Sequence, residues 1–218
     1  MISTRNLSAL PPVETLKKLT QSLAMLDAII ERKWDYRYYS FNSKWGEGEQ
    51  MASMQNGQGD GWFCVFGLPG AFLKGFDHES KMSPWATETH KVWSGVLDDV
   101  PEIFKASATE PAFSMDDTTF CIWHGTQDTQ WSVGEVSYPE GDDPDGSAWM
   151  LSILDRNPNT YRAWAEEYYE RPVSLPAVQQ IYEYAPLTPE LVKELNPTLD
   201  FGSILDDTAE IDYPVAQP

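Results

Sequence analysis

A stripe of apolar residues near the N-terminus constrains the fold more than any other feature of this chain of 218 residues. Pro11 and Pro12 suit the first turn of a helix, where no N–H needs an acceptor. Apolar side chains then recur every three or four residues over about four turns, at Leu16, Leu19, Leu23, Leu26 and Ile30. The stripe is shorter than the three or four heptads of a coiled coil, so it predicts a helix covered by a sheet or by a second copy of the chain.

From Trp34 onward the sequence changes to aromatic and β-branched runs separated by glycine-rich turns, which is typical of antiparallel strands. Asn56-Gly57 and Gly59-Asp60-Gly61 are strong turn signals. The predicted strands are 36–41 and 50–55, then 61–66 and 71–76 as a first hairpin, then 118–124 and 130–138 as a second hairpin. This local pairing predicts one antiparallel sheet from about residue 36 to residue 138.

The chain after residue 146 has the spacing and capping residues of several helices. They cover 148–154 and begin near Asn157-Pro158, Leu175-Pro176 and Thr188-Pro189, where Thr188 suits an N-cap. Residues 206–218 are predicted as an acidic, proline-containing end. Because the helices are segregated from the strands, the fold class is α+β: an antiparallel β-sheet core with an N-terminal helix and a helical C-terminal part. We expect a single domain over 1–218, with a subdomain boundary near residue 140 as the alternative.

Charge is distributed unevenly along the chain. Lys and Arg number 15 and Asp and Glu 34, a formal net charge of −19. Residues 1–100 carry a net charge of −2 and residues 101–218 carry −17. Such a surface repels nucleic acid and anionic membranes, so neither is an expected partner. It would steer a basic protein partner toward the second half of the chain; the alternative is that the charge only keeps the protein dispersed.

Two cysteines, Cys64 and Cys121, lie in apolar, aromatic runs and have no CxxC spacing. They are predicted to be buried free thiols of a reducing compartment; a disulfide would require them to lie on adjacent strands. The most apolar N-terminal stretch, Leu23–Ile30, is interrupted by Asp27 and does not have the form of a signal peptide. No run approaches the length of a transmembrane helix. The expected location is cytoplasmic.

The chemical candidate is Asp77-His78-Glu79, directly after the second strand of the first hairpin. Strand ends commonly carry functional polar groups, and a histidine between carboxylates suits a general base. His124 and His90 are the other imidazoles available to it. The alternative is that Asp77 and Glu79 only cap a turn. No HExxH or HxH pattern is present, so we expect no metal site and no cofactor.

Other motif patterns give weaker signals. The acidic run Glu140–Gly146 invites an EF-hand interpretation, but placing Gly146 at position six puts Gly141 at position one and Ser152 at position twelve, where neither is a ligand. The run is therefore predicted to form a turn and a helix N-cap, and the alternative is a calcium-binding loop of another type. There is no GxSxG elbow and no phosphate-binding glycine motif.

Aromatic residues make up 13% of the chain, including nine tryptophans, and most are expected in the core. Five tryptophans stand beside polar or turn residues and are candidates for exposure: Trp34, Trp45, Trp85, Trp131 and Trp164. In the helical C-terminal part, carboxylates between apolar positions are expected to face solvent. The candidate binding residues there are Glu166, Glu167, Glu170 and Trp164.

The longest distinctive stretch runs from Tyr38 to Trp85 and contains SFNSKW, GEQMASMQNGQGD and GFDHESKMSPW. Further pieces are PAFSMDDTTFCIW, EGDDPDGS and NPNTYRAWAEEYY. These motifs resemble a group of uncharacterised bacterial proteins, and the resemblance covers most of the chain after residue 36. It implies one folded unit and carries no activity.

Three function classes follow from these observations. The first is a non-enzymatic acidic binding protein that docks a basic protein partner, as toxin-neutralising immunity proteins do; size and charge alone support this analogy. The second is a hydrolase or metal-dependent enzyme centred on Asp77, His78 and Glu79. The third is an aromatic-lined small-molecule or carbohydrate binder. No pattern in the sequence specifies an oligomeric state.

Overall fold

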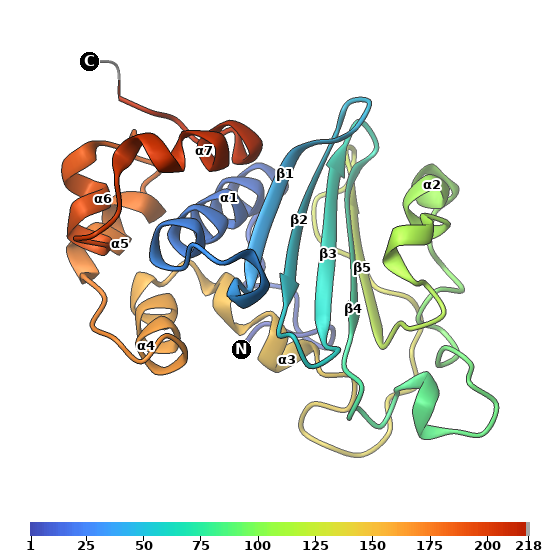
Figure 1. The fold of residues 1–218 in the computed structure, drawn as a ribbon. Helices are drawn as coiled ribbons and strands as arrows, with labels where there is room; N and C mark the ends of the chain where they lie inside the picture. Colours follow the sequence, from blue (N-terminus) through green and yellow to red (C-terminus); the bar gives the residue numbers. More distant parts are fainter. Residues whose placement is uncertain (217–218) are drawn as a thin grey trace.

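The computed structural model describes residues 1–216 and arranges them in layers (Figure 1). The strands are β1 Tyr39–Gly46, β2 Glu49–Gln55, β3 Gly61–Gly67, β4 Gly70–Phe76 and β5 Phe120–Gly125. The helices are α1 Val13–Ile30, α2 Lys105–Ala108, α3 Ser147–Met150, α4 Pro158–Tyr168, α5 Leu175–Tyr182, α6 Pro189–Leu195 and α7 Leu205–Ile211. This is the α+β fold predicted, with an N-terminal helix, an antiparallel sheet and C-terminal helices.

The five strands form one antiparallel sheet in the order of the sequence, β1-β2-β3-β4-β5. Helix α1 lies against one face of the sheet, and α5, α6 and α7 pack on α1 (Figure 1). The long segment between β4 and β5, which includes α2, covers the opposite face, called here the outer face. Among residues 1–216, no helix has both the length and the apolar character needed to cross a bilayer.

Helix α1 is central and not peripheral. All five residues of the apolar stripe are buried, and so is every residue from Leu19 to Ile30. The polar side chains on the face away from the sheet find acceptors on the C-terminal helices: the Ser22 hydroxyl donates to the Ile181 carbonyl at 2.8 Å, and the Gln21 amide donates to the Ile211 carbonyl at 2.8 Å. The helix therefore joins the sheet to the helical layer, and its core cluster extends from Ile2 to Tyr213.

The first hairpin forms as predicted. Strand β3 pairs with β4 from Gly61 opposite Phe76 to Gly67 opposite Gly70. Alternate residues face opposite sides, so Cys64 and Leu73 pack toward α1. Gly75 is required in this strand because a Cβ there would overlap the ring of Phe120 on β5.

The second hairpin and the chain end differ from the sequence-based prediction. Residues 130–138 do not form a strand; Ser132 makes one isolated bridge to Trp123. Gly134 lies against the Gly95 carbonyl, and Val136 packs on the outer-face cluster, so this segment fills space and does not extend the sheet. Of the predicted acidic end 206–218, residues 206–211 belong to α7, whose Asp206 and Asp207 lie in the first turn, where the helix dipole favours negative charge. Residues 217–218 lie outside the described part of the chain.

Both cysteines are buried and free, as predicted. Cys64 lies in the core cluster beneath α1, whereas Cys121 lies in the outer-face cluster. Strand β4 separates their two strands, so they cannot pair. Burial raises the pKa of each thiol, which keeps both protonated and slow to react.

A buried carboxylate connects three elements of the fold. Asp27 of α1 is fully buried and accepts hydrogen bonds at Oδ2 from the N–H groups of Tyr38 and Tyr39, both at 2.9 Å. Its Oδ1 accepts from the Tyr161 hydroxyl of α4 at 2.7 Å. Burial raises the pKa of Asp27 to about 6, although these hydrogen bonds act in the opposite direction.

Two substitutions at Asp27 separate its hydrogen bonds from its charge. Asp27→Ala leaves two main-chain N–H groups and a hydroxyl without an acceptor and should lower the free energy of unfolding by about 3 kcal/mol or more. Asp27→Asn keeps an acceptor for the N–H groups and offers an N–H₂ to the Tyr161 oxygen. It should be at least as stable as the parent at pH 7. Urea unfolding of the three proteins measures this, and an Asn variant as unstable as the Ala variant would contradict it.

The stability of the parent relative to Asp27→Asn should also depend on pH. The folded-state pKa of about 6 lies above the ordinary 3.8, so the protonated form stabilises the fold and this contribution is lost as pH rises through about 6. Raising this pKa from 3.8 to about 6 corresponds to about 3 kcal/mol in the free energy of unfolding. About 1 kcal/mol of that is lost as the pH rises above 5. The stability of the parent should therefore fall relative to Asp27→Asn between about pH 5 and pH 7, a range above the sequence pI of 4.3. A difference that is flat over this range would show that Asp27 is already ionised at pH 5.

Candidate functional site

The register of the β3–β4 hairpin places two carboxylates side by side at its open end. Because Gly61 pairs with Phe76, the flanking residues Asp60 and Asp77 lie opposite each other. Asp60 is buried in the preceding turn, where the Asn56 side-chain amide donates to its Oδ2 at 2.7 Å. The Asn56 carbonyl oxygen in turn accepts from the Asp60 N–H at 3.1 Å. The glycine-rich turn thus fixes the Asp60 carboxylate at the strand end.

Asp60 holds His78 by two contacts. Its Oδ1 accepts from the main-chain N–H of His78 at 2.8 Å and lies 2.6 Å from the ring Nδ1. The hydrogen bond to Asp60 raises the pKa of His78. Burial acts to raise the pKa of Asp60, but the bonds from His78 and Asn56 outweigh it and the net shift is downward. The ring Nε2 of His78 lies 3.9 Å from the exposed carboxylate of Glu79.

The acidic run 140–146 folds against this strand end. The Ser80 hydroxyl donates to the Pro144 carbonyl at 2.8 Å, and the Trp149 indole N–H donates to Asp77 Oδ2 at 2.9 Å. Two cations also hold the run, through main-chain carbonyls: Lys81 donates to Glu140 at 2.8 Å and Arg5 to Gly141 at 3.1 Å.

Within this run, Asp143 accepts from the N–H groups of Ala148 and Trp149 at 3.0 and 2.9 Å. These are the free donors of the first turn of α3, so the N-cap interpretation is confirmed. Asp77 likewise closes a turn, because its Oδ1 accepts from the N–H of Glu79 at 2.9 Å. Hydrogen bonds from neutral N–H groups stabilise a carboxylate without cancelling its charge.

Together these segments enclose an open cleft of about 470 Å³, called here the acidic cleft. Five carboxylates line it: Asp60, Asp77, Glu79, Asp142 and Asp143. The Trp149 side chain also lines the cleft and is 42% exposed. Lys81 is the one cation among the described lining residues, so the cleft is strongly negative.

Two of the cleft carboxylates and the neighbouring His78 form a group with metal-ligand chemistry. Asp60, Asp77 and His78 each offer one ligand atom, and these atoms lie within 4.8 Å of one another. Both oxygens of Asp60 already accept hydrogen bonds, and His78 Nδ1 is one of the groups that they contact. Ligation by this set would therefore compete with the Asp60–His78 bond. The arrangement as it stands orients the imidazole and leaves its Nε2 outward.

The structure does not place His124 with the other catalytic candidates. His124 is on β5 opposite Ala71, at the far end of β4 from His78. Phe76 follows Ala71 by five positions along β4, a span of about 17 Å. The His124 ring packs against Trp131, and its Nδ1 lies 2.8 Å from the Gly125 carbonyl.

The candidate binding residues of the C-terminal part lie on and directly after α4. Glu167 and Glu170 are exposed. Glu166 is half-buried: its Oε1 lies 3.1 Å from Nε of Arg162 and accepts from the Val173 N–H at 3.0 Å, which together lower its pKa. Trp164 is also half-buried, within a ring cluster that adjoins Asp27 and comprises Tyr38, Tyr39, Tyr161, Trp164, Tyr168 and Tyr169. Only part of the predicted α4 surface is therefore free for a partner.

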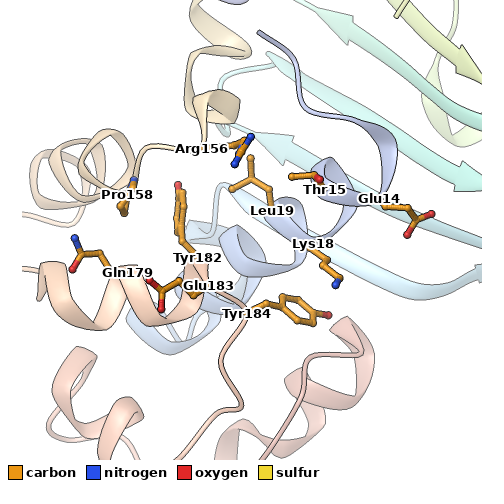
Figure 2. A pocket seen from close by; sticks show the side chains of 10 residues that line it. All are labelled: Glu14, Thr15, Lys18, Leu19, Arg156, Pro158, Gln179, Tyr182, Glu183 and Tyr184. Atoms are coloured by element: carbon orange, nitrogen blue, oxygen red, sulfur yellow. The ribbon is translucent and has the colours of Figure 1, made fainter. Parts of the chain in front are cut away.

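A cavity of about 600 Å³ lies apart from the acidic cleft, between α1 and α5 (Figure 2). Figure 2 shows Glu14 and Lys18 on the wall formed by α1, with Tyr182 and Glu183 across from them. Two carboxylates and two cations line the cavity, the second cation being Arg156. This cavity, lined in part by Tyr182 and Tyr184, is a candidate site for the third function class, a small-molecule binder.

Comparisons of this chain with protein-family models, with curated proteins and with solved structures find no match.

Two residues of the cleft were missing from the sequence-based candidates. Asp60 was assigned only to a turn signal, although the predicted hairpin pairs residue 61 with residue 76 and so places residue 60 opposite residue 77. Trp149 had no such signal, because its approach to Asp77 depends on how the 140–146 run folds back.

Removing the Asp60 charge should change the titration of His78. In Asp60→Asn the pKa of His78 should fall, because the carboxylate that stabilises the imidazolium is gone. The ring proton signals in NMR spectra, followed between about pH 5 and pH 9, measure this. Asp142→Asn removes a carboxylate from the same cleft without touching His78 and serves as the matched control. An equal fall in both variants would show that the general field of the cleft, and not the hydrogen bond, sets the pKa.

Proposed function

We propose that this chain is a non-enzymatic binding module that docks a basic protein partner through the acidic cleft. The observation that carries the proposal is the convergence of five carboxylates around the exposed Trp149. The cleft is large enough for one or two cationic side chains. Toxin-neutralising immunity proteins are one class of protein with this mode of action, and a basic toxin would be the corresponding partner.

The chemistry of the cleft favours arginine on the partner. A guanidinium forms paired hydrogen bonds with a carboxylate and stacks on an aromatic face. Glu79 and Asp142 are exposed, and the Trp149 ring lies in the same cleft. Asp77 holds the indole through its N–H, which keeps the ring in place before a partner arrives. Such preorganisation reduces the entropy lost on binding.

Long-range attraction adds to these contacts. Unpaired charge at an interface mainly accelerates association and makes the rate sensitive to salt. The segment 77–146, which supplies most of the residues that line the cleft, holds 15 acidic and 3 basic side chains, a net charge of −12. This concentration of charge favours the cleft as the docking surface. On the alternative surface, α4, Arg162 partly neutralises Glu166.

A matched pair of charge reversals tests the location of docking. Glu79→Lys with Asp142→Lys changes the cleft, and Glu167→Lys with Glu170→Lys makes the same change in net charge on α4. Basic proteins captured by the immobilised parent from a lysate of the source cells are identified and purified. Their association rates are then measured at about 50 and 200 mM salt. We expect the rate for the parent to fall tenfold or more with salt, and the cleft variant to bind at least tenfold more slowly than the α4 variant.

Three outcomes would overturn the proposal. If the parent captures no basic protein at low salt, the proposed partner does not exist in these cells. Binding insensitive to salt would show that the charge does not act in recognition. A larger loss in the α4 variant than in the cleft variant would move the docking surface to Glu167 and Glu170. Circular dichroism of both variants confirms that the fold is retained.

The Asp60–His78 pair supports a second candidate function, hydrolysis with His78 as general base. A carboxylate that fixes the imidazole and leaves Nε2 outward is the arrangement that such a base needs. Ser80, the hydroxyl residue among the described lining residues, donates to the Pro144 carbonyl, so water would be the nucleophile. Chromogenic carboxyl-ester and phosphoester substrates test this. Turnover should be lost in His78→Ala and reduced in Asp60→Asn, and retained in Asp142→Asn; no turnover by the parent would exclude these substrate classes.

A further inference from the structure

A lysine is buried in the middle of the outer face of the sheet. Lys74 of β4 lies between Phe63 of β3 and Cys121 of β5 in the strand register, and its residue surface is 4% exposed. Its ammonium lies 5.7 Å from the centre of the Phe76 ring. Within residues 1–216, no carboxylate oxygen lies within 4.0 Å of this ammonium. Lysine is rarely buried without a charged partner, so this position needs an explanation.

Lys74 lines an open cavity of about 610 Å³ between the sheet and the segment that follows α2. The aromatic wall consists of Phe63, Phe76 and Phe113, and Phe63 stacks on Phe113 with ring centres 4.9 Å apart. Asp60 and Asp117 also line the cavity. The cavity thus combines apolar walls with one amine and two carboxylates.

The charges of this cavity select the kind of molecule that can enter. Two carboxylates repel an anion, and the Lys74 amine, when protonated, repels a cation. A neutral molecule with one polar group suits the remaining combination of aromatic walls and a single amine. We propose that this cavity binds a small neutral aldehyde or ketone and that the Lys74 amine forms an imine with its carbonyl carbon.

The environment of Lys74 suits this reaction. Burial lowers the pKa of Lys74 to about 8, although Asp117 and Cys121 act in the opposite direction. At pH 7 about a tenth of such amines are neutral, roughly 300-fold more than for a lysine with the ordinary pKa of 10.5. The neutral amine is the nucleophile, and desolvation is one of the ways in which proteins activate lysine.

The step is balanced without any oxidant or reductant. The Lys74 nitrogen forms a bond to the carbonyl carbon, and one of its two protons passes to the carbonyl oxygen, which becomes a hydroxyl. The hydroxyl then takes the second nitrogen proton and leaves as water, which gives a C=N bond. Asp117 lines the same cavity and can carry these protons: its Oδ1 accepts from the Trp85 indole N–H at 2.8 Å, and its other oxygen makes no hydrogen bond within residues 1–216. The carboxylate is therefore held in position with one oxygen available.

Reductive trapping tests the proposal on the parent protein itself. Benzaldehyde and cyanoborohydride are added at pH 7, and peptide mass spectrometry measures the labelling rate of Lys74 against that of the exposed Lys44. We expect Lys74 to react at least tenfold faster. The ratio should fall as the pH rises from about 7 to 10, because surface amines lose their protons in that range. Propanal, which lacks a ring to lie against the phenylalanines, should show a smaller ratio.

Two variants separate the reactive amine from its surroundings. Lys74→Met should abolish the fast labelling, and Asp117→Asn, which keeps an acceptor for Trp85, should slow it several-fold. Thermal unfolding of both variants checks the fold. Labelling of Lys74 no faster than that of Lys44, or a ratio that does not change with pH, would show that Lys74 only fills space beneath the loops. The docking variants at Glu79 and Asp142 lie outside this cavity, so failure here is distinct from failure of the docking proposal.

Discussion

The hydrogen bonds accepted by Asp27 are the constraint on which the arrangement of layers depends. One carboxylate takes the first two N–H groups at the start of the sheet and the hydroxyl of Tyr161 on α4. It does so from the buried last turn of α1, where water cannot substitute for any of the three contacts. The same turn of α1 therefore fixes both the start of β1 and the position of α4. The aromatic rings around Asp27 exclude water and also explain why its pKa is raised.

The same use of carboxylates explains why the net charge of −19 is not neutralised inside the fold. Acidic side chains act mainly as acceptors for neutral donors: Asp143 caps α3, Asp77 closes a turn and binds an indole, and Glu166 accepts from the Val173 N–H. Each bond fixes local structure and leaves the charge in place. Few basic residues are available to offset it, and two of them, Arg5 and Lys81, bind main-chain carbonyls instead. The electric field of the acidic cleft is therefore a consequence of how the chain builds its turns.

Local signals in the sequence predicted most of the framework, because helix spacing, proline and asparagine caps and tight turns act over a few residues. The α1 stripe, the β3–β4 hairpin, the helix start near Asn157-Pro158 and the N-cap at Thr188 follow from such signals. The register of that hairpin also contained the Asp60–Asp77 pairing. The features that failed were those decided by distant partners. Residues 130–138 have the alternating pattern of a strand but pack against Gly95 instead. Trp149 contacts Asp77 in the cleft only because the acidic run 140–146 folds back. The position of Lys74 shows the same limit: Lys74 alternates with Phe72 and Phe76 along β4, and nothing in that pattern indicates a cavity.

Asp60 gives the acidic cleft and the Lys74 cavity a shared wall, because it lines both. The two sites nevertheless depend on opposite physical properties. The cleft acts through exposed charge, which salt weakens, whereas Lys74 depends on burial, which salt affects little. His78 and Asn56 hold the Asp60 carboxylate from the cleft side and from the turn, so its orientation does not rely on either ligand. A partner that inserts a cation beside Asp60 would reduce the negative potential in the wall that faces Lys74. This would disfavour the Lys74 ammonium and increase its neutral fraction, so occupation of the cleft and reactivity of Lys74 should rise together.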